Sequence, residues 1–194
     1  MAITRLRSFP PPQAPAAGPW KAPDLERFPD DGYQYEIWQG ELVRMAPAGG
    51  RHGECEANLV TALRQQTRTS GRVYTGDTGF LLRENPDVLV APDVAFVRHD
   101  RLPPPARRIR YLRVVPDLVI EIRSPNDEET DVQAKLGIYL AAGVPLIWLV
   151  DPQHQMAEEI RSGESKTLRG AAGDVLDGGQ VVPGFQLPLA EVFD

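Results

Sequence analysis

The fold is decided by residues 116–152, PDLVIEIRSPNDEETDVQAKLGIYLAAGVPLIWLVDP. Residues 118–122 form a short apolar, β-branched run between proline-containing breaks, which predicts a strand buried on both faces. Residues 131–142 have helical period and are followed by Gly143, a common helix terminator. The apolar run 146–150 then predicts a second strand, parallel to the first and reached by a right-handed crossover.

Two charged side chains fall inside this βαβ unit, where apolar residues are expected. Glu121 lies within the first strand, and a helical wheel places Lys135 inside the apolar arc of the helix. Burying an unpaired ammonium is costly, so Lys135 must either extend to the end of the sheet or meet a carboxylate. Glu121 is the nearest candidate partner.

The composition favours one globular domain. The chain has 194 residues, of which 42% are hydrophobic and 25% are charged, enough for a sizeable core. Residues 1–23 are rich in proline and alanine without usable periodicity, so we expect a flexible N-terminal arm. Residues 24–194 are expected to form the single domain.

The few cysteines and histidines limit which disulfides and metal sites are possible. Cys55 is the only cysteine and the three histidines are far apart in sequence, so spacing offers neither a disulfide framework nor a zinc site. This usage is typical of the reducing cytoplasm, where we expect the protein. The first residues lack the apolar segment of a secretion signal, and the longest apolar stretch, 139–150, is interrupted by Gly143 and Pro145. We expect no membrane association.

The N-terminal part of the domain predicts a hairpin and a helix. Residues 33–38 and 41–46 alternate around Gln39-Gly40, which indicates an N-terminal β-hairpin. Residues 52–66 have helical period, and His52 and Glu56 share one face of that helix. A solvated acid is the commoner explanation for Glu56, so both are kept only as possible accessory site residues.

Two further strands are predicted before the βαβ unit, at residues 73–82 and 88–97. Pro92 lies inside the second strand, which implies an edge or a bulge that could turn Asp93 out of the pleat. After the βαβ unit, residues 157–170 predict an exposed hairpin, and residues 181–193 are expected to pack a C-terminal turn on the sheet.

Together, Pro92-Asp93, Glu121, Arg123 and Lys135 form a constellation that resembles the PD-(D/E)XK nuclease superfamily. Within it, the chain is similar to a bacterial family labelled "putative restriction endonucleases". The resemblance covers residues 33–194 and rests on the stretches YEIWQGELVRM, APDVAFV, LVIEIRSP, KLGIYLAAGV, WLVDP and PGFQLPLAEVF. It implies an α/β fold with a restriction-endonuclease-like core, in which helices flank a mixed central β-sheet.

The resemblance also implies a metal-dependent phosphodiesterase site. Carboxylates at adjacent strand ends can hold Mg²⁺, so Asp93 and Glu121 would be its ligands, with Mn²⁺ as a substitute. By resemblance, the carbonyl of Ile122 would complete the set. Arg123 occupies the position of the usual lysine and cannot serve as a base, so Lys135 would supply the ammonium. The structural alternative is a salt bridge among Glu121, Arg123 and Lys135.

The net charge of −6 argues against a dedicated high-affinity nucleic-acid binder, yet one segment is strongly basic. Residues 98–113 hold six arginines and one acid, and Arg107, Arg108 and Arg110 are candidate phosphate contacts, although a merely solvated loop explains them equally well. Because this loop separates the strands of Asp93 and Glu121, we expect it to emerge beside the predicted site.

Three functions remain open. The first is a nuclease that hydrolyses nucleic acid, with DNA preferred over RNA. The second is a catalytically inactive nuclease-fold module that binds or regulates, which the acidic balance and Arg123 favour. The third is a structural protein that self-associates through the arm and the arginine loop. We expect a homo-oligomer, with a dimer favoured, because two-fold pairing suits cleavage of both strands of a duplex.

Overall fold

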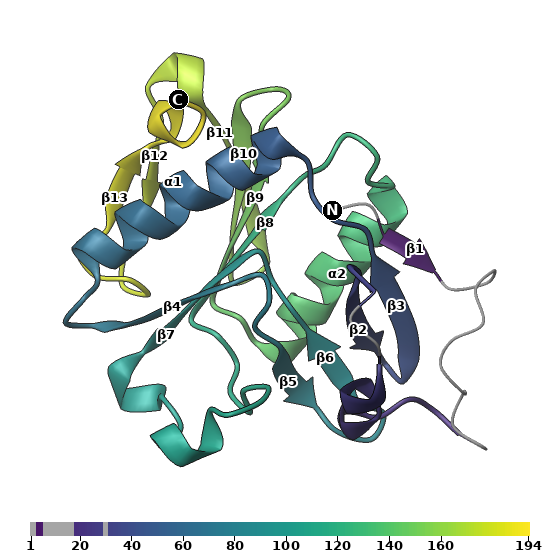
Figure 1. The fold of residues 1–194 in the computed structure, drawn as a ribbon. Helices are drawn as coiled ribbons and strands as arrows, with labels where there is room; N and C mark the ends of the chain where they lie inside the picture. Colours follow the sequence, from purple (N-terminus) through teal and green to yellow (C-terminus); the bar gives the residue numbers. More distant parts are fainter. Residues whose placement is uncertain (1–2, 6–17, 29–30) are drawn as a thin grey trace.

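The computed structural model describes residues 3–5, 18–28 and 31–194. A mixed six-stranded sheet lies at its centre, and only β8 and β9 are parallel neighbours (Figure 1). The predicted α/β class with a mixed central sheet is therefore confirmed. In spatial order the strands are β11 (Glu164–Arg169), β10 (Met156–Arg161), β9 (Leu146–Asp151), β8 (Leu118–Ile122), β7 (Val94–Arg98) and β4 (Gly71–Thr75).

The predicted βαβ unit is present as β8, α2 (Glu129–Ala142) and β9. The helix ends at Gly143, whose φ of 81° is left-handed and therefore favours glycine. The two strands pair in parallel from Leu118 opposite Leu146 onward. Their continuous apolar runs are explained by burial, because helices cover both faces of this sheet (Figure 1).

Each face of the large sheet buries alternate residues of the same strands. Phe96 and Ile120 belong to the core that contains the helix α1 (Gly50–Gln66). Val97 and Val119 belong to the core that contains α2. The predicted C-terminal packing is also present, because β12 (Val175–Asp177), β13 (Gln186–Pro188) and the 3₁₀ turn η5 (Leu189–Val192) contribute to the α1 core.

A second, smaller sheet packs against α2 from the side opposite the large sheet (Figure 1). Its centre is the predicted hairpin, β2 and β3, whose turn residues Gln39 and Gly40 have φ values of 53° and 83°. Two positive φ angles in a two-residue turn match the twist of a hairpin. In spatial order the strands are β1 (Ile3–Arg5), β3 (Glu41–Met45), β2 (Gln34–Trp38), β6 (Val88–Val90) and β5 (Phe80–Arg83).

Two strand predictions were wrong in the same way. Residues 73–82 divide into β4 and β5, and residues 88–97 divide into β6 and β7, so each predicted strand contributes to both sheets. In the second case the cause is Pro92, which has no N–H to donate to a continuing ladder. The chain therefore crosses between the sheets at Pro92, and Asp93 lies at that crossing.

Residues 1–2 and 6–17 of the predicted N-terminal arm lie outside the described residues. The backbone N–H of Trp20 donates to the Gly40 carbonyl at 2.8 Å. Buried Ala22 likewise donates to the Asp87 carboxylate at 2.8 Å, at the start of the 3₁₀ turn η1 (Ala22–Arg27). Trp20 and Ala22 therefore pack against the small sheet. Within the described ranges, every helix is too short or too polar to cross a bilayer.

Alanine substitutions at two glycines should change the stability of the fold in opposite directions. An added Cβ at Gly137, in α2, would meet no heavy atom within 4 Å, so Gly137→Ala should stabilise the fold by about 0.5–1 kcal/mol. At Gly71 the same atom would lie 2.3 Å from the ring of Phe96 and 2.5 Å from the carbonyl oxygen of Val97, so Gly71→Ala should destabilise it. Thermal or urea unfolding of both variants measures this, and equal shifts would contradict the packing described.

Candidate active site

The candidate site lies at one end of the large sheet, where β7 begins and β8 ends. The antiparallel register pairs Val94 with Ile120, so Asp93 and Glu121 are the next residues along the two strands. The Asp93 carboxylate accepts a hydrogen bond from the backbone N–H of Ile122 at 2.7 Å. The structure therefore brings the two predicted acids to the same end of the sheet.

Lys135 extends from α2 into a cage of carboxylates. Its Nζ lies 3.0 Å from the Glu121 carboxylate and 3.1 Å from that of Glu36. Tyr139, one helical turn further along α2, donates its hydroxyl hydrogen bond to Glu121. Lys135 and Glu36 are 6% and 0% exposed in their side chains, so this ion-pair cluster is almost dry. The predicted meeting of Lys135 with Glu121 is thus present in the structure.

Glu36 is the site residue that sequence reasoning missed. One of its carboxylate oxygens accepts the backbone N–H of Ala91 at 2.7 Å and the other accepts the indole N–H of Trp38 at 2.5 Å. Glu36 and Trp38 are two residues apart on β2, so both side chains face the α2 side of the small sheet. The available signal was an acid inside a predicted strand, the same feature that singled out Glu121.

Burial and charge shift the pKa values of this cluster. Burial alone would lower the pKa of Lys135, but Glu121 and Glu36 outweigh it and hold that pKa above its usual value. Lys135 therefore stays an ammonium and cannot act as a base at neutral pH. Burial raises the pKa of Glu121 to about 8, against the opposing charge of Lys135. At Asp93, burial is outweighed by the hydrogen bond and charge of His52, which lower the pKa.

The two possible accessory residues lie beside Asp93. His52 Nε2 is 3.1 Å from Asp93 Oδ2, and its side chain is buried. Glu56 follows one turn later on α1 and is half-buried rather than fully solvated. Burial raises the pKa of Glu56, and the nearby charge of Asp93 adds to this. Both side chains line a cavity of about 360 Å³ with Asp93.

The predicted salt bridge of Glu121, Arg123 and Lys135 is wrong in one member. Arg123 forms its ion pair with Glu129 at the start of α2, and Glu36 takes the place that was assigned to it. Arg123 lies one residue beyond the end of β8 and its guanidinium reaches Glu129, whereas Glu36 approaches Lys135 from the small sheet.

The predicted position of the arginine loop is also wrong. The loop leaves the C-terminal end of β7 and enters the N-terminal end of β8, because these strands are antiparallel. Asp93 and Glu121 lie at the other end, roughly 16 Å away at the usual rise per strand residue. Arg110 pairs with Glu26, and Arg108 donates to the carbonyl of Pro103. For Arg107, Arg108 and Arg110, phosphate binding stays a prediction without support from position.

The donor set fits a hard cation better than zinc. Among the residues that the structure describes, no three or more His, Cys, Asp or Glu side chains are arranged to hold a metal. Mg²⁺ does not require such a cage, since it keeps several waters and takes only one or two carboxylates. Asp93, Glu121 and the Ile122 carbonyl would supply oxygen ligands alone. Glu121 and Ile122 line a cavity of about 30 Å³, the volume of roughly one water.

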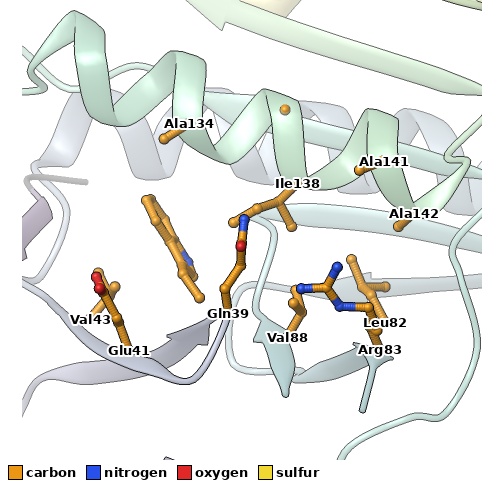
Figure 2. A pocket seen from close by; sticks show the side chains of 12 residues that line it. Gln39, Glu41, Val43, Leu82, Arg83, Val88, Ala134, Ile138, Ala141 and Ala142 are labelled. Carbon is orange, nitrogen blue, oxygen red and sulfur yellow. The ribbon is translucent and has the colours of Figure 1, made fainter. Parts of the chain in front are cut away.

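A larger cavity, of about 690 Å³, lies away from this site, between α2 and the small sheet. Figure 2 shows Ala134, Ile138 and Ala141 lining it from the helix, while Glu41 and Arg83 project from separate strands below. Its walls mix polar and apolar side chains and hold only one acid, Glu41, so the candidate active site is the smaller polar region around Asp93 and Glu121.

Removing the buried ammonium tests the cage. Lys135→Met should leave the carboxylates of Glu121 and Glu36 without their cation and destabilise the metal-free protein by about 3–5 kcal/mol. Urea unfolding in EDTA measures this, and Lys166→Met, on exposed β11, is the matched control with an expected change below about 0.5 kcal/mol. An equal loss of stability in the two variants would show that the buried ion pairs of Lys135 contribute no more than an exposed lysine does.

The raised pKa of Glu121 predicts an unusual pH dependence. Its usual value of 4.5 applies to the unfolded chain and about 8 to the folded one, so the folded state binds this proton more tightly. The stability of the metal-free protein should therefore fall as the pH rises from 4.5 to about 8, by up to about 1.4 kcal/mol per pH unit. Glu121→Gln should flatten that slope in thermal melts with EDTA. A variant slope as steep as the wild-type slope would assign the effect to other groups.

Comparison with known proteins identifies the family and the fold of this chain. The family model "Uma2: Putative restriction endonuclease" matches residues 22–190. A solved structure, a "putative nuclease belonging to DUF820 from Anabaena variabilis ATCC 29413", matches with a TM-score of 0.78 and 18% identity, over 90% of this chain and 98% of that one. At this identity the structural match shows the fold alone, and no curated protein matches the chain. Because the family model spans most of its length, this protein belongs to the Uma2 family of "putative restriction endonucleases".

Proposed function

We propose that this protein hydrolyses phosphodiester bonds of nucleic acid, DNA before RNA, with Mg²⁺ as cofactor and Mn²⁺ as a substitute. The observation that carries the proposal is the meeting of Asp93, Glu121 and the buried ammonium of Lys135 at one end of the sheet. Family membership supports nuclease chemistry in general. The metal, the substrate and the residue roles are our inference.

Each residue has a defined task in this proposal. Asp93, Glu121 and the carbonyl of Ile122 would hold the metal ion, which when bound polarises a phosphate and lowers the pKa of a coordinated water. Lys135 stays protonated, so its role is to stabilise negative charge that develops on the phosphate. Glu36 and Tyr139 hold the Lys135–Glu121 pair in place, and His52 orients the Asp93 carboxylate.

The start of α1 offers a place for the substrate phosphate. The helix begins after Gly49, which provides no side-chain cap, so the first-turn N–H groups are available to an anion. An added Cβ on Gly49 or Gly50 would meet nothing within 4 Å, which indicates open approach. His52 belongs to the same turn and contacts Asp93, so this anion-binding end lies beside the proposed metal ligands.

One observation favours the inactive module as a second candidate. Lys135 is already paired with two glutamates, which stabilises the cluster without any metal. An inactive module would keep these ion pairs for stability and have no metal-dependent turnover. Catalytic assays and metal binding therefore distinguish the two.

The first test is catalytic. Purified protein, assayed on single- and double-stranded DNA and RNA, should cut nucleic acid only with Mg²⁺ or Mn²⁺, and Asp93→Ala should lose this activity. Glu36→Gln should reduce the rate about 10–100-fold, as expected for a group that positions a site residue. Glu164→Gln, at the exposed start of β11, should match wild type. Cleavage that persists in Asp93→Ala would indicate a contaminating nuclease and reject the proposal.

The second test is metal binding without turnover. Mg²⁺ or Mn²⁺ should raise the melting temperature of the wild type, by the equivalent of about 2.7 kcal/mol at one hundred times the dissociation constant. Asp93→Ala should show no such shift. An unchanged wild type, or the same shift in the variant, contradicts a site built on these carboxylates and favours the inactive module.

A further inference from the structure

The cavity on the other side of Asp93 from the Lys135 cage has a chemistry that phosphodiester hydrolysis alone does not explain. It measures about 360 Å³, within the range of small-molecule sites. Asp93 lines it, whereas Glu121 and Lys135 line the separate small cavity. Its polar walls come from the start of β2, the first turns of α1, the loop between β4 and β5 and the crossing between β6 and β7. They are Tyr33, Gln34, His52, Glu56, Asp77 and Asp93.

These walls are rich in hydrogen-bond acceptors. Asp77 accepts the side-chain N–H of Gln34 at 2.7 Å, which leaves the amide oxygen of Gln34 buried without a hydrogen-bond partner. Glu56 adds a second carboxylate, and neither lysine nor arginine lines the cavity. Such walls favour a ligand that carries several N–H or O–H donors.

A buried histidine points to the same conclusion. His52 is 5% exposed, and within the described part of the chain neither ring nitrogen makes a well-aligned hydrogen bond, although Nε2 lies 3.1 Å from Asp93 Oδ2. An unmet buried polar atom costs about 1–3 kcal/mol, which a bound ligand with a suitable group would recover. Gln34 and His52, which both line the cavity, therefore each have a buried polar atom without a hydrogen-bond partner.

The rim supplies a flat aromatic surface. Tyr33 is 40% exposed, and the guanidinium of Arg44 lies 3.3 Å from the centre of its ring, which fixes the ring in place. Stacking of a nucleobase on such a ring contributes about 1–3 kcal/mol. The cavity thus combines a stacking surface with an acceptor-rich wall, next to a residue of the proposed catalytic site.

We propose that this cavity binds an unpaired nucleobase next to the scissile phosphate, with guanine preferred. This inference rests on the proposed function. Guanine carries adjacent N1–H and N2–H donors, which match a wall of paired acceptors, while adenine and cytosine each offer a single amino group. A base inside a duplex is stacked and paired, so the substrate must be single-stranded or have this nucleotide flipped out.

Binding without cleavage tests the inference directly. Fluorescence anisotropy in EDTA should compare labelled single-stranded DNA pentamers TTXTT, in which X is G, A, C or T. The double-stranded probe is a longer, stable duplex that contains the TTGTT sequence. The wild type should bind the G pentamer about tenfold more tightly than the others, as expected for a two-point base contact, and more tightly than the duplex. Asp77→Asn and Tyr33→Ala should each reduce that ratio, and Glu164→Gln should preserve it.

Several results would overturn the inference: equal affinity for the four pentamers, tighter binding of the duplex, or a guanine preference unchanged in both variants. Asp77 is exposed, so its asparagine variant should fold, and melting curves verify this. Repeating the series with Mg²⁺ separates the two proposals. Guanine-selective binding without cleavage supports the cavity and rejects hydrolysis, whereas cleavage without base preference supports hydrolysis and rejects the cavity.

Discussion

The structure depends on the ion pairs that Lys135 makes with Glu121 and Glu36. These three side chains come from α2, from the large sheet and from the small sheet, so one ammonium joins all three layers. A buried cluster of this kind contributes little net stability compared with apolar packing, but it is strongly destabilised when one member is lost. Its value lies in fixing where α2 and the two sheets meet, and that meeting point is beside Asp93.

The break at Pro92 is the second constraint on the site. A continuous strand from Val88 onward would keep its residues within a single sheet. Because proline interrupts the ladder, β6 stays in the small sheet and β7 enters the large one. Asp93 follows the break, and the backbone N–H of Ile122 and the ring of His52 hold its carboxylate in position. The same interruption that complicates the sheet thus presents the acid to the site.

Patterns within short stretches of sequence predicted the structural elements that form from neighbouring residues. The βαβ unit, the hairpin and the inward Lys135 followed from apolar runs, turn residues and a helical wheel, and the family resemblance is confirmed. Glu36 was missed because its partner is about one hundred residues away, in another layer. The arginine loop was misplaced because the order of elements does not reveal strand direction, and the antiparallel pairing of β7 with β8 turns the loop away from the acids. Both errors concern contacts between elements that are far apart in the sequence.

The charge count around Lys135 has a consequence for ion selectivity. When Asp93, Glu121 and Glu36 are all ionised, three negative charges surround one positive charge, and burial gives water little access to screen the excess. A sodium ion would leave this region negative, whereas one divalent ion would bring it to neutrality. Without such an ion, neutrality requires protons, and the raised pKa of Glu121 reflects that need. A divalent cation bound here, as we propose, would compete with protons for the same carboxylates.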